Sequence, residues 1–473
     1  MTRIARTALI FWAAITALVA ASLLIIYLRW GIAGFSIFIQ QWPLTDLPIV
    51  LVSAALTWLL AGFLLYRLAN EKINSSNALT FAGFFLIAFV YLNVLSERFR
   101  YGDYQYYLQA ANNLLQHKPL PSTYFYLPLW ATLLEPIAPL GDAGMLLILW
   151  LVNILSLFLF YFLLHRLLET YGFSIRLAAI AATLFILVNT PLLRTLDYVQ
   201  VNLLVINFIF LSLLLYPKYS FLSALSLALA VHLKTSPAVL VLAFLLEKDW
   251  RWFGWFILSF LLLAAIPVVV NGISPYFDYL NNIRGLTQAR QAIFHETSFD
   301  SFFRFIVSAL KLPNIFVEIA ADAAKVILAA AAFFVMAQCV RMKAFFSPSP
   351  NPLPKGEGQR GEGTNLLNAV PSLLVLMLLA SPVVWEHHGI FVALSFLLML
   401  KRIDSPSEWM WFGFAYFLEF VLPTFDFFPW SYGRLLAPLI ILWLMLKTIK
   451  KQESSRFFSA INNWLTKLPA SET

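Results

Sequence analysis

Long apolar runs recur from one end of this chain to the other. Each is roughly 17 to 25 residues long, the length of helix needed to cross about 30 Å of hydrocarbon. The composition agrees, because 61% of the residues are hydrophobic and only 12% are charged, about half the charged share of a soluble domain. The sequence therefore predicts an all-α polytopic membrane protein without a sizeable soluble domain.

The apolar runs define about 12 to 14 transmembrane or re-entrant helices. We expect them near 8–28, 47–66, 78–96, 143–164, 177–193, 199–216, 219–233, 236–247, 252–271, 313–340, 367–384, 388–401, 409–422 and 434–448. The first run is longer than the apolar region of a signal peptide, so we interpret it as an uncleaved span. The runs 237–246 and 388–400 are short and lie beside polar or proline breaks, as in broken or re-entrant helices.

Lysine and arginine concentrate on one side of this topology, which the positive-inside rule identifies as cytoplasmic. With the N-terminus cytoplasmic, that side receives Arg67, Lys72, Arg166, Arg176, Lys218, Lys248, Arg251, Arg341, Lys343, Lys401, Arg402, Lys447, Lys450 and Lys451. The other side receives the polar stretches GDYQYY, RTLDYVQ (194–200), 272–312, WEHH (385–388) and PTFDFFPWSYGR (423–434). We therefore expect a multi-pass protein of the cell (inner or plasma) membrane whose chemistry takes place on the extracytoplasmic side.

One segment, SPSPNPLPKGEGQRGEGT (347–364), is dense in proline, glycine and charge and cannot bury a core. We expect a membrane-embedded catalytic module over 1–344, a disordered cytoplasmic linker over 345–366, C-terminal membrane helices over 367–450 and a cytoplasmic tail over 451–473. The linker glycines have GxGxxG spacing, but neither the strand nor the helix of a dinucleotide site flanks them. The single cysteine, Cys339, allows no intrachain disulfide, and we expect it to have a packing role.

Asp103 is a carboxylate placed among tyrosines and arginines in the stretch ERFRYGDYQYY, directly after an apolar run. The residues that follow predict a helix lying in the membrane interface, because apolar side chains recur at helical spacing at Tyr107, Leu108, Ala111, Leu114 and Leu115. Asp103 would thus sit just outside the bilayer, where a lipid-borne substrate presents its head group. The alternative is a loop carboxylate that pairs with Arg98 or Arg100 or caps the helix.

Four stretches in order along the chain resemble the GT-C glycosyltransferases, specifically the family 87 polyprenyl-phosphate-dependent mannosyl- and arabinosyltransferases. They are GDYQYYLQAANNLL with YFYLPLWATLLEPIAPL, QVNLL (200–204), HLKTSP (232–237) and SPVVWEHH (381–388). The sequence departs from the family where Leu127 replaces the first proline of Tyr-Pro-Pro and where Val199 replaces a glycine. The resemblance implies a GT-C-like fold with an interfacial helix in the first large extracytoplasmic loop.

The resemblance also implies transfer of a sugar, such as the hexose mannose or the pentose arabinose, from a polyprenyl-phosphate donor to a lipid-linked or glycolipid acceptor. An acidic residue of the first large extracytoplasmic loop is then the general base of an inverting reaction, and here that residue is Asp103. The leaving lipid phosphate needs no carboxylic acid to protonate it, unlike the leaving group of a glycosidase. The competing carboxylates are Asp197, Asp278, Glu296, Asp300 and Glu386.

Cations are expected to hold the donor phosphate. Lys234 lies within an apolar run, where an ammonium is costly and functional by default, and Arg284, His387 and His388 are the further candidates. Their alternatives are contact with lipid phosphates for Arg284 and interfacial packing for the histidines, whose adjacent positions diverge by about 100° on a helix and do not suit a shared metal. We expect no metal and no cofactor. The predicted substrate pocket comprises Tyr104, Tyr126, Gln200, Asn202, Trp385 and Glu386.

A secondary transporter or flippase of a lipid or sugar is the main rival, since broken helices and buried cations also mark transport pathways. Against it, the chain shows no pair of matching inverted halves, and its polar residues gather on one face. A structural scaffold is a third alternative. The net charge of +8 does not indicate nucleic-acid binding, because it lies mainly in predicted cytoplasmic loops.

Overall fold

The structure is a computed structural model that describes residues 102–288, 297–313, 315–341, 363–381, 383–422 and 432–465, with scattered positions between 9 and 91. Over these residues it forms helices and no strand. The first half contains α4 (Tyr104–Leu115), α5 (Pro128–Leu134), η1 (Ala138–Leu140), α6 (Gly141–Thr170), α7 (Ile175–Leu187), α8 (Thr190–Asp197), α9 (Asn202–Leu215), α10 (Ser220–Leu233), η2 (Ser236–Leu240), α11 (Val241–Leu246) and α12 (Trp250–Asn271). The second half contains α13 (Ser274–Gln288), α14 (Phe299–Ala309), α15 (Ile315–Arg341), α16 (Gly363–Leu379), η3 (Glu386–Val392), α17 (Ala393–Met399), α18 (Pro406–Tyr416), η4 (Phe417–Val421) and α19 (Gly433–Leu465).

Several helices are long and apolar enough to cross a membrane, which confirms the predicted all-α polytopic membrane protein. Within the described residues there are four of them, Trp12–Arg29, Ala138–Thr170, Trp250–Asn271 and Ile315–Gln338, and the bent pair α7–α8 makes a fifth when counted as one span. The spans expected near 47–66 and 78–96 fall largely outside the described residues, so the total number of spans stays a prediction.

The remaining apolar helices are shorter than a full span. α9 and α10 have 14 residues each, which gives about 21 Å at 1.5 Å per residue, against about 30 Å of hydrocarbon. The expected single span 177–193 is broken after α7, because Asn189 caps α8 by accepting the Leu192 N–H at 2.9 Å and Pro191 lacks an N–H. Such breaks leave polar helix ends inside the bundle, where they line a site.

Side-chain hydrogen bonds join the central helices. α9 packs against α6 and α10, and α10 packs against α12. The Ser223 hydroxyl of α10 donates to the Ser212 carbonyl oxygen of α9 at 2.8 Å and accepts from the Trp252 indole of α12 at 2.9 Å. Small serines allow this close approach, and their hydroxyls satisfy each other away from water.

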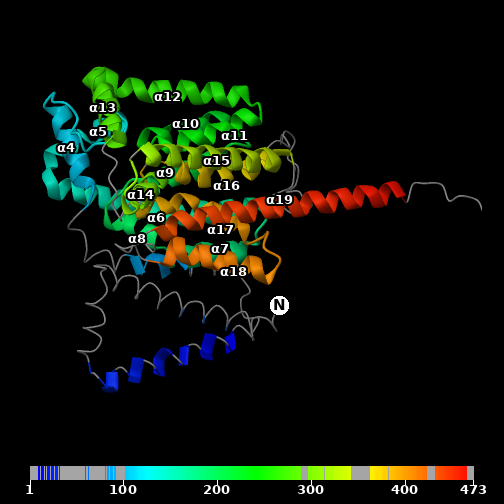
Figure 1. The fold of residues 1–473 in the computed structure, drawn as a ribbon. Helices are drawn as coiled ribbons and strands as arrows, with labels where there is room; N and C mark the ends of the chain where they lie inside the picture. The colour runs from blue at the N-terminus through cyan, green and yellow to red at the C-terminus, as the bar shows by residue number, and fades with distance from the viewer. Residues whose placement is uncertain are drawn as a thin grey trace, which may run out of the picture.

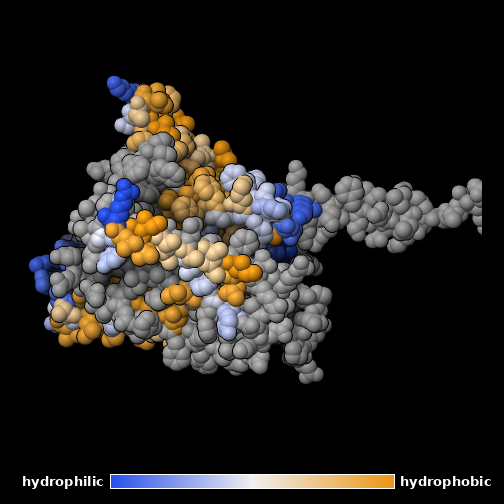
Figure 2. All heavy atoms as spheres, turned by 90° about the horizontal axis from the view of Figure 1, so that it is seen from below, coloured by the Kyte–Doolittle hydropathy of each residue, from blue (hydrophilic) through white to orange (hydrophobic). Residues whose placement is uncertain are grey.

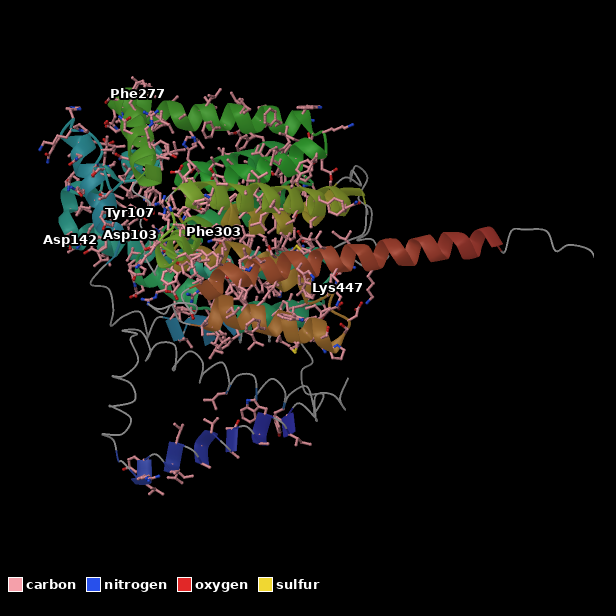
Figure 3. All side chains as sticks on the ribbon, in the orientation of Figure 1. Asp103, Tyr107, Asp142, Phe277, Phe303 and Lys447 are labelled. Carbon is pink, nitrogen blue, oxygen red and sulfur yellow. The ribbon has the colours of Figure 1, made fainter. Side chains whose placement is uncertain are left out.

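The bundle has two chemically different ends. Figure 1 shows α12, α15 and α19 running along the bundle, with α4, α5 and α13 gathered at one end. Figure 3 places Asp103, Tyr107 and Asp142 at that end and Lys447 toward the other. Among the coloured residues of Figure 2, hydrophobic side chains cover much of the surface between hydrophilic groups at the left and the right, and some also reach the left end. Exposed apolar surface of this kind is expected where a membrane protein faces lipid.

Three boundaries differ from the expected ones. The segment 272–312, expected as a long polar stretch, contains the helices α13 and α14, and Ser298 caps α14 by accepting the Ser301 N–H at 3.2 Å. α16 begins at Gly363, inside the expected linker, whose residues 345–362 lie outside the described part of the chain. α19 continues to Leu465, so the expected tail begins as an extension of the last helix.

The separation of the two ends predicts opposite labelling of two exposed lysines. Lys118 comes shortly after α4, at the end of the bundle that holds Asp103. Lys218 comes shortly after the last residue of α9, a helix whose first residue, Asn202, lies at the site. In a chain whose native Cys339 is replaced by serine, Lys118→Cys should react with an impermeant maleimide added to intact cells. Lys218→Cys should react only after permeabilisation, because basic loops stay cytoplasmic. Reaction of Lys218→Cys from outside would reverse the topology.

Candidate active site

Asp103 stands immediately before α4, where a side chain often caps a helix. Its carboxyl group makes no capping hydrogen bond, so the alternative in which Asp103 caps the helix is wrong. Its Oδ2 instead accepts a hydrogen bond from Nε2 of Gln200. The other alternative, an ion pair with Arg98 or Arg100, falls on residues outside the described part of the chain.

A backbone contact holds the start of α4 against the end of α8. The Asp103 N–H donates to the Tyr198 carbonyl oxygen at 2.8 Å. A Cβ atom at Gly102 would lie 2.5 Å from that same oxygen, well inside van der Waals contact. The Tyr198 carbonyl oxygen therefore comes close enough to bind the Asp103 N–H only because the preceding residue is glycine.

The end of α8 presents Tyr198 and Gln200 through a Schellman motif. The Gln200 N–H donates to the Thr195 carbonyl oxygen at 2.9 Å, and the Val199 N–H donates to that of Leu196 at 3.1 Å. Val199 has a φ of 53°, which costs a side chain with a Cβ roughly 1–2 kcal/mol. Its side chain is buried, which contributes about 1.5 kcal/mol or more. Burial thus offsets the strain at a position where the resembling family has glycine.

The buried Gln200 side chain is oriented by two tyrosines. Its Oε1 accepts hydrogen bonds from the hydroxyls of Tyr126 at 3.0 Å and Tyr107 at 3.2 Å. The two rings meet edge to face, with centroids 5.3 Å apart. Because the amide oxygen faces two hydroxyl donors, the amide nitrogen faces Asp103. The network therefore fixes a hydrogen-bond donor beside the carboxyl group.

Lys234 follows the last residue of α10 and meets the first residue of α9. Its Nζ donates to Oδ1 of Asn202 at 3.0 Å and lies 5.4 Å from the centroid of the Phe391 ring, a cation–π distance. The ammonium also acts electrostatically on Asp103. An ammonium has three N–H donors, and Asn202 engages one of them, so Lys234 keeps donors for a ligand oxygen.

His387 and His388 are adjacent in η3, with ring centroids 4.7 Å apart and ring planes at 85°. The Trp385 N–H donates to Nδ1 of His388 at 3.3 Å, so a neutral His388 ring carries its proton on Nε2, where it is a donor. The His387 carbonyl oxygen accepts from the side chains of Asn202 and Thr195, both at 3.3 Å. These contacts place the histidine segment beside Asn202 and, through it, beside the lysine.

Glu386 forms ion pairs with two arginines. Its Oε1 accepts from Nη2 of Arg434 on α19 at 2.7 Å, and its Oε2 accepts from Nε of Arg194 on α8 at 3.2 Å. We call these three residues the arginine–glutamate bridge. A carboxylate paired with two guanidinium groups is a poor proton acceptor, because both pairs favour its charged form. Glu386 is therefore a weaker candidate for the base than Asp103, and its place in the substrate pocket stays a prediction.

Residues 124–347 match the family model of glycosyltransferase family 87. The chain carries a family 87 glycosyltransferase domain. The resemblance and the enzyme class predicted from the sequence are thereby confirmed, and GT-C superfamily membership is consistent with this family. Among curated proteins, none matches the chain.

The family 87 domain covers only part of the assembled site. Gln200 and Lys234 lie inside the matched range, whereas Asp103 lies before it and His387 and His388 lie after it. Hydrogen bonds join these parts, since Gln200 contacts Asp103 and Asn202 contacts the histidine segment. The catalytic assignment therefore rests on contacts that the family match does not itself supply.

Three predicted residues lie apart from the hydrogen-bonded group around Asp103. The Tyr104 hydroxyl donates to Oδ2 of Asp142 at 3.1 Å. The Trp385 side chain is 38% exposed, as is usual for tryptophan at a membrane interface. Arg284 has an exposed side chain on α13. The expected roles of these three in binding substrate stay predictions.

The competing carboxylates have other partners. Oδ2 of Asp197 lies 3.6 Å from Nη1 of Arg194. Oδ2 of Asp278 accepts the Leu120 N–H at 3.0 Å, and Asp300 forms an ion pair with Lys325. The remaining competitor, Glu296, lies outside the described residues. Asp103, in contrast, accepts a hydrogen bond from the Gln200 amide and lies within electrostatic reach of Lys234, the cation expected to hold the donor phosphate.

Burial raises the pKa of the Asp103 carboxyl group to about 6, although the Lys234 ammonium and the Gln200 amide both act to lower it. A value near neutral suits a general base, because the group is ionised at physiological pH and still holds a proton well once it accepts one. Among the described side chains, no group of three or more His, Cys, Asp or Glu residues could hold a metal ion.

Tyr107, Arg194 and Arg434 belong to the site but were not among the residues predicted from the sequence. Each lies in a polar stretch that was expected on the extracytoplasmic side, and Tyr107 is the last residue of the GDYQYY stretch. Composition could mark those stretches but not their pairing, because Tyr107 meets Gln200 and Arg434 meets Glu386 only after the helices pack.

Gly102→Ala should damage the site selectively. The added Cβ would meet the Tyr198 carbonyl oxygen, so α4 must shift and Asp103 must lose its backbone hydrogen bond, at about 1–3 kcal/mol. We expect transfer activity to fall by roughly 5- to 150-fold if that free energy is lost from the site. The matched control is Gly254→Ala on α12, where a Cβ meets nothing within 4 Å and activity should be unchanged. Equal activity of the two variants would contradict the fixed approach.

Proposed function

We propose that this protein transfers a sugar, a hexose such as mannose or a pentose such as arabinose, from a polyprenyl-phosphate donor to a lipid-linked or glycolipid acceptor. The observation that carries the proposal is the half-buried Asp103 carboxyl group, held by Gln200 and standing within electrostatic reach of the Lys234 ammonium. A proton acceptor and a phosphate-binding cation are the two groups that such a transfer needs.

The reaction is a single displacement. The Asp103 carboxylate accepts the proton of an acceptor hydroxyl as its oxygen bonds to the anomeric carbon. The bond from that carbon to the phosphate oxygen breaks, and its electron pair leaves with the lipid phosphate. Attack opposite the leaving group inverts the anomeric centre. Lys234 and the Nε2 proton of His388 offset the charge on the phosphate, and Asp103 later releases its proton to water.

The site faces the extracytoplasmic side in this proposal. The support is the position of Asp103 at the end of the bundle opposite Lys447 (Figure 3), together with the concentration of lysine and arginine in the loops assigned to the cytoplasm. A donor anchored by its polyprenyl chain keeps its phosphate at the membrane surface. A carboxylate placed just outside the helical spans therefore meets the sugar without extraction of the lipid.

Asp103→Asn keeps the size of the side chain but removes its capacity to accept the proton. The turnover of purified enzyme with radiolabelled polyprenyl-phosphate sugar and membrane lipid extract should fall by roughly 10²–10⁴. The donor KM should change little, because the cations that hold the phosphate are intact. Near-normal turnover would remove Asp103 from the mechanism.

The pH profile of the unmodified enzyme gives an independent test of the same group. Because the active form of Asp103 is ionised, kcat/KM should rise as pH increases through about 6. A profile that is flat from pH 5 to pH 8 would disagree with a base of this pKa.

Lys234→Met should weaken donor binding through loss of a charge-assisted contact, worth roughly 1.5–3 kcal/mol or about tenfold or more in donor KM. The ammonium also lowers the pKa of Asp103, so its removal should move the rise in kcat/KM to higher pH. The matched control is Lys218→Met, an exposed lysine at the other end of α9, which should leave both quantities unchanged. An unshifted profile in Lys234→Met would show that this lysine does not act on the base.

A further inference from the structure

α13 carries a stripe of exposed apolar side chains. Ile273, just before the helix, is 55% exposed, and Phe277 and Leu280 are each 59% exposed. Spacings of four and three residues put them on one helical face, and Arg284, also exposed, continues the same stripe after four more residues. Figure 3 places Phe277 on the outer side of α13, away from the other labelled residues.

The stripe is continuous with the lipid-facing surface of α12. Val269 and Val270, in the last turn of that membrane-spanning helix, are also largely exposed. The chain then turns at Gly272, whose φ of 75° favours glycine, and α13 lies across the end of the bundle (Figure 1). An apolar face that starts where a span ends, and that finishes in an arginine, matches the order of acyl chains and phosphates in a bilayer.

The opposite face of α13 holds the segment that leads to the aromatic side chains of the site. Oδ2 of Asp278 accepts the Leu120 N–H at 3.0 Å. Nδ2 of Asn282 donates to the carbonyl oxygens of Pro121 at 2.7 Å and Tyr124 at 3.0 Å. Two residues beyond Tyr124 comes Tyr126, whose hydroxyl binds Gln200.

We propose that α13 docks in the membrane interface at the Asp103 end of the bundle, with Ile273, Phe277 and Leu280 among the outer acyl carbons, and thereby holds residues 120–124 in place. This assigns Arg284 to the phosphates of the bilayer in place of the donor phosphate. The bilayer sets the height of the aromatic side chains above the membrane, and with it the height of the site. The docking is independent of the sugar and the acceptor.

Spin labels on the full chain in phospholipid nanodiscs test the docking. In the Cys339→Ser background, labels at Phe277→Cys and Leu280→Cys should collide with oxygen several-fold more than with a water-soluble nickel chelate. Labels at the exposed positions Ser274→Cys and Gly285→Cys, which lie about 90–110° from the centre of the stripe on the helix, should collide relatively more with the nickel chelate. Nickel access at 277 and 280 equal to that at 274 and 285 would overturn the proposal, as would immobilised labels shielded from both reagents, which indicate a protein partner.

A second measurement tests whether docking holds the segment. A label at Lys118→Cys, in the exposed stretch before Leu120, should become more mobile when Phe277→Ser and Leu280→Ser are combined. The control pair Phe277→Leu and Leu280→Met keeps the apolar face and should leave the spectrum unchanged. An unchanged spectrum in the serine pair would overturn the link between the membrane and the site. Neither measurement uses transfer activity, so failure here is distinguishable from failure of the proposed reaction.

Discussion

The hydrogen bond from Gln200 to Asp103 is the interaction on which the site depends. It joins the start of α4 to the end of α8, and the Tyr198 carbonyl oxygen secures the same junction through the backbone. The amide can donate to Asp103 only because Tyr107 and Tyr126 occupy its oxygen. A buried network of this kind is stabilising when every member is satisfied and costly when one is missing. The four side chains therefore act as one unit.

Short and broken helices give the enzyme polar groups inside the helix bundle without exposing the backbone to lipid. α9 begins at Asn202 and α10 ends before Lys234, so two helix ends meet inside the bundle and their side chains pair. η3, a seven-residue 3-10 helix between α16 and α17, supplies the histidines in the same way. Irregular backbone is tolerated there because neighbouring helices satisfy it.

Hydrophobic periodicity was sufficient to predict the fold class and most helices. In lipid, each apolar run must pair its own backbone N–H and C=O groups, and a helix does this within one segment. The periodicity also predicted the helix after Asp103, now seen as α4. It missed the break before α8, which depends on the capping side chain of Asn189 and on Pro191. It also missed the helices within 272–312, because polar residues in that segment are typical of a loop. Asp103 and Lys234 were selected because charges are rare in this chain, and these two residues and the histidines also lie in the stretches that resemble family 87. Arg434 could not be predicted as a site residue, because its contact with Glu386 joins two positions that are brought together by tertiary packing alone.

The arginine–glutamate bridge has a consequence for the order in which the site is built. Arg194 precedes the histidine segment in the chain, but Arg434 belongs to α19, the last helix of the described residues. Membrane helices are synthesised and packed from the N-terminus onward, so Glu386 has one guanidinium partner until α19 is in place. Asp103 and Lys234 would thus be in place before the histidine segment is held from both sides. A product that stops before α19 would retain the Arg194 contact of Glu386 and lack the Arg434 contact, so its histidine segment would be anchored on one side alone.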